Sequence, residues 1–281
     1  MAVAAYASTA RNIDRGLVYA RLTRRSFGGR LTIAALVSGL GWASAAHADL
    51  ADVIPQIKPS VVIVGYYKST NNPRFGLRGT GFVVGEGNRV ITNAHVLVAP
   101  GEEDGRDLVV NVRSSKDGWE TRRAKVLEID ATHDIAALQV EGPPIPGLRV
   151  RDSDTVKEGE SVAFMGFPIG GALGFSPVTH RAMISSITTI SLPAATGRQL
   201  SEKVIRSLRD GNFGIFQLDG TAYPGNSGGP LFDVGTGEVV GVINMVFVKG
   251  TRESALTNPS GISYAIPSKF FAELLARQKP R

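Results

Sequence analysis

Short runs of apolar residues, rich in valine and isoleucine, recur along the chain between polar or glycine-containing stretches. Runs of this length and composition predict β-strands rather than helices. The predicted strands cover residues 61–67, 79–85, 90–92, 108–112, 124–129, 135–140, 161–164, 183–187, 215–218, 230–232, 239–247 and 262–266. The 33 glycines and 15 prolines among 281 residues agree with many tight turns. We therefore expect an all-β body, which suits two packed β-barrels.

Three segments break this pattern. Residues 142–154 contain Pro143, Pro144 and Pro146 and are the natural crossover between barrels at about 60–141 and 155–267. Residues 199–209 have helical spacing before Gly211, which predicts a helical insertion. Residues 269–278 predict a short amphipathic C-terminal helix.

The first 48 residues have the parts of a secretory signal peptide. Arg24 and Arg25 precede a mostly apolar stretch at 31–48, which lacks Lys and Arg and ends in Ala46-His47-Ala48. This arrangement indicates export to the periplasm or the exterior, with cleavage after Ala48. The arginine pair resembles a twin-arginine signal; an ordinary Sec signal and an uncleaved anchor are the alternatives.

The formal net charge of +6 comes mainly from this leader. Residues 1–48 hold six of the 31 basic residues and one of the 25 acidic residues, so residues 49–281 are nearly neutral. We therefore expect no nucleic-acid partner, and membrane contact only transiently through the signal segment. The chain has no cysteine, so its stability must come from the hydrophobic core rather than from disulfides.

The strongest chemical signal is a serine in a glycine-rich turn, Pro224-Gly225-Asn226-Ser227-Gly228-Gly229-Pro230-Leu231. Ser227 is the candidate nucleophile. The backbone of Gly225, Asn226 and Ser227 is the candidate oxyanion hole, with the N–H groups of Gly225 and Ser227 as donors. The same composition is ordinary for a loop, so the interpretation depends on partner residues elsewhere.

A serine hydroxyl needs an imidazole base, which in turn needs a carboxylate to orient it. Of the four histidines, His95 directly follows an apolar strand and is the best placed. Asp134 precedes the apolar run at 135–140 and is the candidate acid. The order histidine, aspartate, serine is that of chymotrypsin-like proteases. The alternatives are a surface or capping role for His95, and a capping Asp134 beside a functional His133.

Four segments together resemble the trypsin-like protease domain of the HtrA (Deg) family. They are Gly79-Thr80-Gly81-Phe82-Val83-Val84, Ile91-Thr92-Asn93-Ala94-His95-Val96, His133-Asp134-Ile135-Ala136-Ala137-Leu138 and Gly225-Asn226-Ser227-Gly228-Gly229-Pro230-Leu231. Residues 50–62 resemble the family's opening helix and first strand, and residues 261–268 its closing strand. The resemblance covers nearly all of residues 49–281.

The resemblance implies two six-stranded antiparallel barrels with the active site between them. It implies a serine endopeptidase acting on unfolded or extended exported polypeptides, with a His95, Asp134 and Ser227 triad and no metal or cofactor. It also implies a homotrimer. Many relatives carry a PDZ domain after the protease domain, and we expect none here because too few residues follow the helix predicted at 269–278. The insertion at 190–213 is expected to be a lid, a sensor loop or a packed surface helix.

A substrate pocket is also expected, because residues 239–247 would run beside the nucleophile turn and extended peptides commonly bind proteases by adding a strand to such an edge. Thr221 is expected near its base, and its walls are expected at Ile243, Asn244, Met245 and Val246. An uncharged Thr221 disfavours Arg or Lys, and the branched Val246 disfavours large aromatics, so cleavage after small or medium aliphatic residues is expected. The alternative function is a protease-like chaperone that binds peptides and cleaves slowly or not at all.

Overall fold

The structure is a computed structural model that describes residues 49–97, 104–114, 118–168, 175–189, 213–244 and 261–277. The chain divides into two units, residues 1–45 and 46–281, and all the described residues lie in the second. The predicted signal segment at 1–48, the predicted helix at 199–209, Met245 and Val246 lie outside the described residues.

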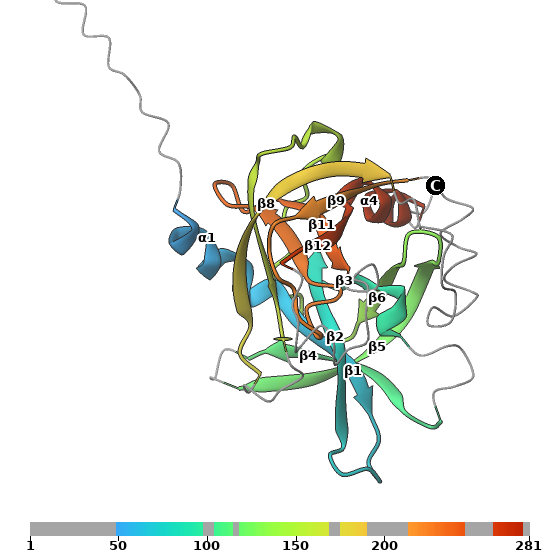
Figure 1. Ribbon diagram of the computed structural model, residues 1–281. Coiled ribbons are helices and arrows are strands. Elements are labelled where there is room, and N and C mark those ends of the chain that lie inside the picture. The colour runs from blue at the N-terminus through green and yellow to red at the C-terminus, as the bar shows by residue number, and fades with distance from the viewer. Residues whose placement is uncertain are drawn as a thin grey trace, which may run out of the picture. The chain divides into compact units, whose positions relative to one another are not determined.

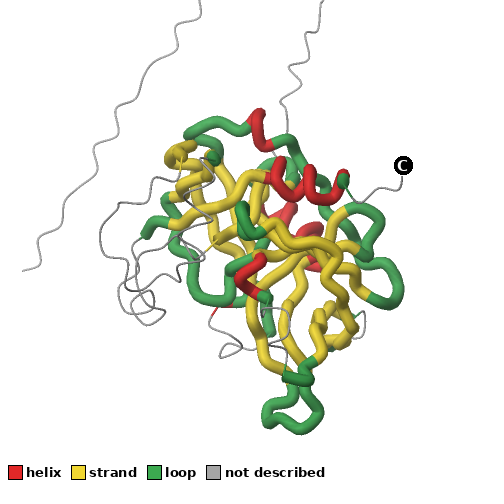
Figure 2. Tube along the Cα trace, turned by 90° about the vertical axis from the view of Figure 1, so that its right-hand side faces the viewer, coloured by secondary structure: helices red, strands yellow, loops and turns green. Residues whose placement is uncertain are grey.

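Strands dominate the described part of the chain (Figure 2). The strands are β1 (Val61–Tyr67), β2 (Phe75–Val84), β3 (Arg89–Asn93), β4 (Asp107–Arg113), β5 (Trp119–Asp130), β6 (Ile135–Val140), β7 (Ser161–Gly166), β8 (Val178–Thr189), β9 (Gly214–Leu218), β10 (Pro230–Asp233), β11 (Val239–Asn244) and β12 (Ser263–Pro267). The α-helices are α1 (Leu50–Ile57) and α4 (Ser268–Ala276), and single 3₁₀ turns lie at Lys58–Ser60, Ala94–Val96 and Ser153–Thr155.

The strands close into two six-stranded antiparallel barrels (Figure 1). Barrel one has the order β1-β2-β3-β6-β5-β4, and barrel two has the order β10-β11-β12-β9-β8-β7. The trypsin-like fold predicted from the sequence is confirmed.

The continuous apolar run of β1 follows from its position between two cores. Successive side chains of a strand point to opposite faces. Val62 and Val64 pack inside barrel one, while Val61 and Ile63 belong to a second core that extends into barrel two. Because both faces are buried, the strand reads as unbroken hydrophobic sequence rather than as an alternating one.

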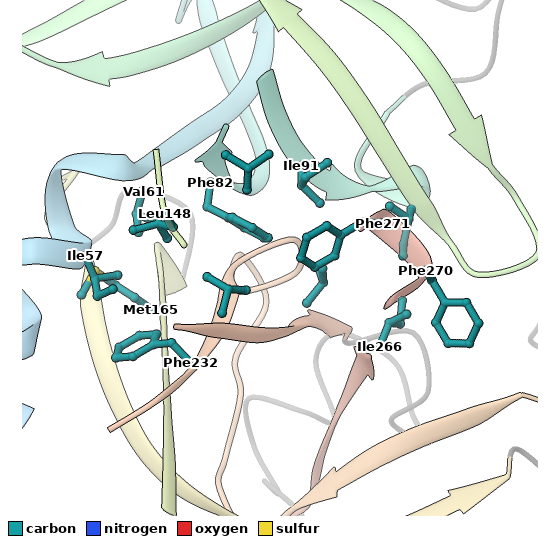
Figure 3. Packing of buried hydrophobic residues seen from close by; sticks show 14 of the residues in the cluster. Ile57, Val61, Phe82, Ile91, Leu148, Met165, Phe232, Ile266, Phe270 and Phe271 are labelled. Carbon is teal, nitrogen blue, oxygen red and sulfur yellow. The ribbon is translucent and has the colours of Figure 1, made fainter. Parts of the chain in front are cut away.

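This second core joins the two barrels and the two helices (Figure 3). Phe82 of barrel one meets Phe271 of α4 edge to face, with ring centroids 5.7 Å apart and an interplanar angle of 76°. Ile57 of α1 and Phe232 of β10 belong to the same cluster. The interior of barrel two forms a third core. The packing between the barrels therefore holds together the elements that carry the candidate site.

The proline-containing crossover connects the barrels by backbone pairing. The N–H of Leu148 donates to Val83 O in barrel one at 2.8 Å, and the N–H of Arg151 donates to Val239 O in barrel two at 2.9 Å. The Arg151 guanidinium also pairs with Glu160 and with Asp233. The segment is thus fixed against both barrels.

Three strands begin four or five residues earlier than the apolar pattern predicted, and the first of them, β2, begins at Phe75 rather than at residue 79. β5 begins at Trp119 rather than at residue 124, and β8 begins at Val178 rather than at 183. The polar residues of these stretches of β5 and β8 are exposed or half-buried, and their backbones pair with β4 and β7. Within the described residues, no helix has the length and apolar character needed to cross a membrane.

Candidate functional site

The pairing of β3 with β6 brings His95 and Asp134 together. Asn93 at the end of β3 lies opposite Ile135 at the start of β6, so residues just after β3 lie beside residues just before β6. His95 Nδ1 is 2.6 Å from Asp134 Oδ2. The backbone N–H of His95 donates to Asp134 Oδ1 at 2.8 Å. One carboxylate thus holds both the ring and the backbone of the histidine.

The backbone of Asp134 is itself held in an uncommon conformation. Its φ is +53°, in the left-handed region that few residues other than glycine adopt. Its carbonyl oxygen accepts hydrogen bonds from Ala94 N and from Asn93 Nδ2, each at 3.1 Å. The segment after β3 therefore fixes the aspartate from its backbone as well as from its side chain.

Asn244, at the end of β11 in barrel two, is a further partner of the acid. Its Nδ2 donates to Asp134 Oδ2 at 2.7 Å, and the residue is fully buried. Hydrogen bonds to a carboxylate are stronger than those between neutral groups. We predicted Asn244 as a pocket wall, and that stays a prediction; its side chain pairs with the candidate catalytic acid across the two barrels. Nothing in the local sequence indicated this contact.

Ser227 lies in a buried turn that contacts both β2 and β3. Its carbonyl oxygen accepts from Thr80 N at 2.9 Å. A Cβ on Gly228 would come within 2.4 Å of Thr92 Oγ1 and 3.1 Å of Asn93 N. The turn therefore lies against the segment that leads to His95. Among the hydrogen bonds of the described residues, none joins Ser227 to the His95 ring. Such bonds often tighten only when substrate binds.

The three backbone N–H groups of the predicted oxyanion hole differ in their bonding, and the hole stays a prediction. The N–H of Asn226 donates to Tyr223 O at 2.9 Å, so it is engaged within the turn. The N–H groups of Gly225 and Ser227 have no acceptor among the described backbone hydrogen bonds. Asn226 is fully buried, and its side-chain amide has no hydrogen-bond partner in the described structure. Burying an unpaired amide lowers the stability of the fold, so other contacts of the turn must offset this loss.

Two more of the predicted pocket residues, Ile243 and Thr221, lie within the described part of the chain. The side chain of Ile243 is fully buried in the core of barrel two, and its role as a pocket wall stays a prediction. Thr221 is half-buried, and its place near the base of the pocket stays a prediction. The nearby carboxylate of Asp219 accepts from Met183 N at 2.6 Å, which fixes this loop to β8. Ser263 Oγ accepts from Ala222 N at 2.7 Å.

The other described histidines have structural partners. His133 Nδ1 is 2.7 Å from Asp130 Oδ2, and its ring stacks on Phe270 of α4 at a centroid distance of 3.9 Å. His133 thus pairs with a different acid from His95. His180 stacks on Phe164 inside barrel two, and burial lowers the pKa of its ring. Within the described residues, His95 is the histidine bonded to Asp134.

Comparison with known proteins agrees with this arrangement. A family model described as a trypsin-like peptidase domain matches residues 79–242. A probable periplasmic serine endoprotease DegP-like of Marinomonas sp. (strain MWYL1) is 34% identical over 194 residues, covering 68% of this chain and 33% of the relative. Serine protease HTRA3 of Homo sapiens is 30% identical over 241 residues, covering 82% and 46%. The chain spans about a third to a half of the length of these relatives.

Solved structures share the fold. HtrA-type protease AlgW with tripeptide has a TM-score of 0.58 at 22% identity, covering 82% of this chain and 63% of that one. Deg5 has a TM-score of 0.57 at 22% identity, covering 79% and 90%. The chain therefore belongs to the trypsin-like peptidase family, and it is similar to HtrA-type proteases.

Proposed function

We propose that the chain is a serine endopeptidase in which His95, Asp134 and Ser227 act as a catalytic triad. The observation that carries the proposal is the double hydrogen bonding of Asp134 to the ring and the backbone of His95. A carboxylate on Nδ1 leaves Nε2 as the ring nitrogen that accepts the serine proton. Membership of the trypsin-like peptidase family supports the same assignment.

The reaction is acyl transfer from a peptide bond. His95 takes the proton of the Ser227 hydroxyl as the oxygen attacks the carbonyl carbon, and Asp134 stabilises the imidazolium that forms. The N–H groups of Gly225 and Ser227 then hold the oxyanion. The protonated imidazole passes its proton to the leaving amine. A water activated by the same imidazole releases the acyl group from Ser227.

The test is covalent labelling of the serine. A fluorophosphonate probe should label the wild-type protein at Ser227, and Ser227→Ala should abolish labelling. The same substitution should lower peptide hydrolysis by about 10⁴- to 10⁶-fold without unfolding the protein, because the removed oxygen is the nucleophile. Labelling at another serine, or hydrolysis that survives in Ser227→Ala, would contradict the assignment.

The proposed specificity is cleavage after small or medium aliphatic residues. Thr221, which is expected near the base of the pocket, carries no charge, so it offers no acid for Arg or Lys. A library of peptides that differ at the residue before the cleaved bond measures this preference. Preferred cleavage after Arg, Lys or Phe would contradict it.

The proposed substrates are unfolded or extended polypeptides outside the cytoplasm, most directly in the periplasm. The leader sequence and the periplasmic names of the DegP-like relatives support this location. Fractionation of cells that express the full chain, followed by sequencing of the processed N-terminus, measures both location and cleavage after Ala48. An assembly of three copies stays a prediction from the family.

A protease-like binding module is the alternative function. The observation in its favour is that Ser227 and the His95 ring share no hydrogen bond among those of the described residues. Labelling in the presence and absence of an unfolded polypeptide separates the two functions. An active protease labels in both conditions, a switched protease labels only with the polypeptide, and a binding module labels in neither.

A further inference from the structure

Thr80 of β2 lies behind the nucleophile turn and bonds to it twice. The residue is fully buried. Its Oγ1 donates to Gly225 O at 2.6 Å, and its backbone N–H donates to Ser227 O at 2.9 Å. The two carbonyls belong to the two residues whose N–H groups form the proposed oxyanion hole. One residue of barrel one therefore holds both donor residues of barrel two.

The direction of the Thr80 hydroxyl is fixed by a third bond. Phe167 N, directly after β7, lies 3.1 Å from Thr80 Oγ1. An amide N–H can only donate and a carbonyl oxygen can only accept. The hydroxyl therefore accepts from Phe167 and must give its own proton to Gly225. No other assignment satisfies both neighbours.

Gly225 is the residue of the turn that most needs such a restraint. Its φ is +105°, a region open to glycine, and it has no side chain to hold it in place. The Phe167 carbonyl closes one side, since a Cβ on Gly225 would come within 2.1 Å of that oxygen. The Thr80 hydroxyl holds the Gly225 carbonyl, so it restrains the peptide group that follows Gly225.

We propose that Thr80 is a positioning residue: its hydroxyl holds the Gly225 carbonyl and its backbone N–H holds the Ser227 carbonyl, so that both residues keep their N–H groups facing the reacting carbonyl oxygen. This inference rests on the proposed protease function. It goes further because it assigns the shape of the oxyanion hole to a side chain of the opposite barrel, one that touches no reacting atom.

The test compares variants with and without the hydroxyl. Thr80→Val removes it and keeps the branched shape, whereas Thr80→Ser keeps it. We expect Thr80→Val to lower kcat by about 10- to 100-fold with little change in KM, because displaced donors lose oxyanion stabilisation. The affinity for a peptide boronate, which places an oxygen in the hole, should fall by a similar factor. Thr80→Ser should restore both.

A control separates positioning from simple loss of stability. Ser268 Oγ also donates to a carbonyl, Arg151 O, at 2.6 Å from a nearly fully buried position. Ser268→Ala should lower the unfolding midpoint and leave kcat and boronate affinity close to wild type. If Thr80→Val does not fold, the pair Thr80→Ala and Thr80→Ser, which differ only in the hydroxyl, is compared instead.

The outcomes distinguish the two proposals. If the wild-type protein labels at Ser227 and the variants without the hydroxyl match it in kcat and boronate affinity, Thr80 is not a positioning residue. If those variants lose activity only as far as they lose folded protein, the role is structural and the inference is also wrong. If the wild-type protein neither labels nor hydrolyses peptides, the proposed function fails, and the inference fails with it.

Discussion

The sharpest prediction concerns Gly225→Ala. A Cβ built on Gly225 lies 2.1 Å from Phe167 O, whereas real Cβ atoms stay at least 3.0 Å from such an atom. The neighbouring backbone belongs to a tightly packed junction of both barrels, so the turn must move by about 0.9 Å to relieve the overlap. The residue that moves carries an oxyanion donor.

The cost has two parts. An alanine in the left-handed region loses about 1–2 kcal/mol relative to glycine, which lowers the free energy of unfolding. The displacement adds a catalytic loss, since a shift of about 1 Å at a reacting group can cost about 100-fold in rate. We therefore expect Gly225→Ala to lower kcat by about 100-fold or more, with a smaller effect on KM.

Gly159→Ala is the matched control. Gly159 has a φ of +88°, and a Cβ there meets nothing within 4 Å. Gly159→Ala should therefore lower the free energy of unfolding without displacing the turn that carries Ser227. Both variants are compared by hydrolysis of a fluorogenic peptide, corrected by active-site titration, and by urea unfolding. A Gly225→Ala protein that hydrolyses the peptide as fast as Gly159→Ala would refute the reasoning.

Three further predictions follow from buried contacts. Asn244→Leu removes the 2.7 Å bond to Asp134 and should lower kcat by about tenfold, equivalent to about 1.4 kcal/mol; an unchanged kcat would contradict a role for Asn244. Phe271→Ala removes a fully buried ring and should cost about 3–5 kcal/mol in urea unfolding, whereas a loss below about 1 kcal/mol would contradict its place in the core between the barrels. Burial lowers the pKa of His180 below its ordinary value of 6.5, so the unfolded chain binds the proton more readily; stability should fall as the pH drops from about 6.5 through the lowered pKa. His180→Phe should reduce this fall in thermal unfolding, and an identical pH dependence would argue against it.

The sequence determined the fold class because strands buried on both faces appear as continuous apolar runs. The predicted bounds of β1 and β6 agree with the structure residue for residue. The polar first half of β5 was missed because its strand character comes from backbone pairing with β4, which side-chain composition does not record.

The sequence also determined the candidate chemistry, since His95, Asp134 and Ser227 each stand in a local motif that names a role. The histidine and the acid could be paired in advance because each flanks a predicted strand. The structure then brought them to 2.6 Å.

Only the tertiary structure decided what surrounds these groups. Asn244 reaches Asp134 from 110 residues away along the chain, and Thr80 reaches Gly225 from 145. Nothing in either local sequence indicates such a partner, because a hydrogen bond depends on distance in space and closing two barrels sets that distance independently of spacing along the chain. The sequence thus named the candidate reacting groups, and the packing of one barrel on the other decided which side chains hold them in place.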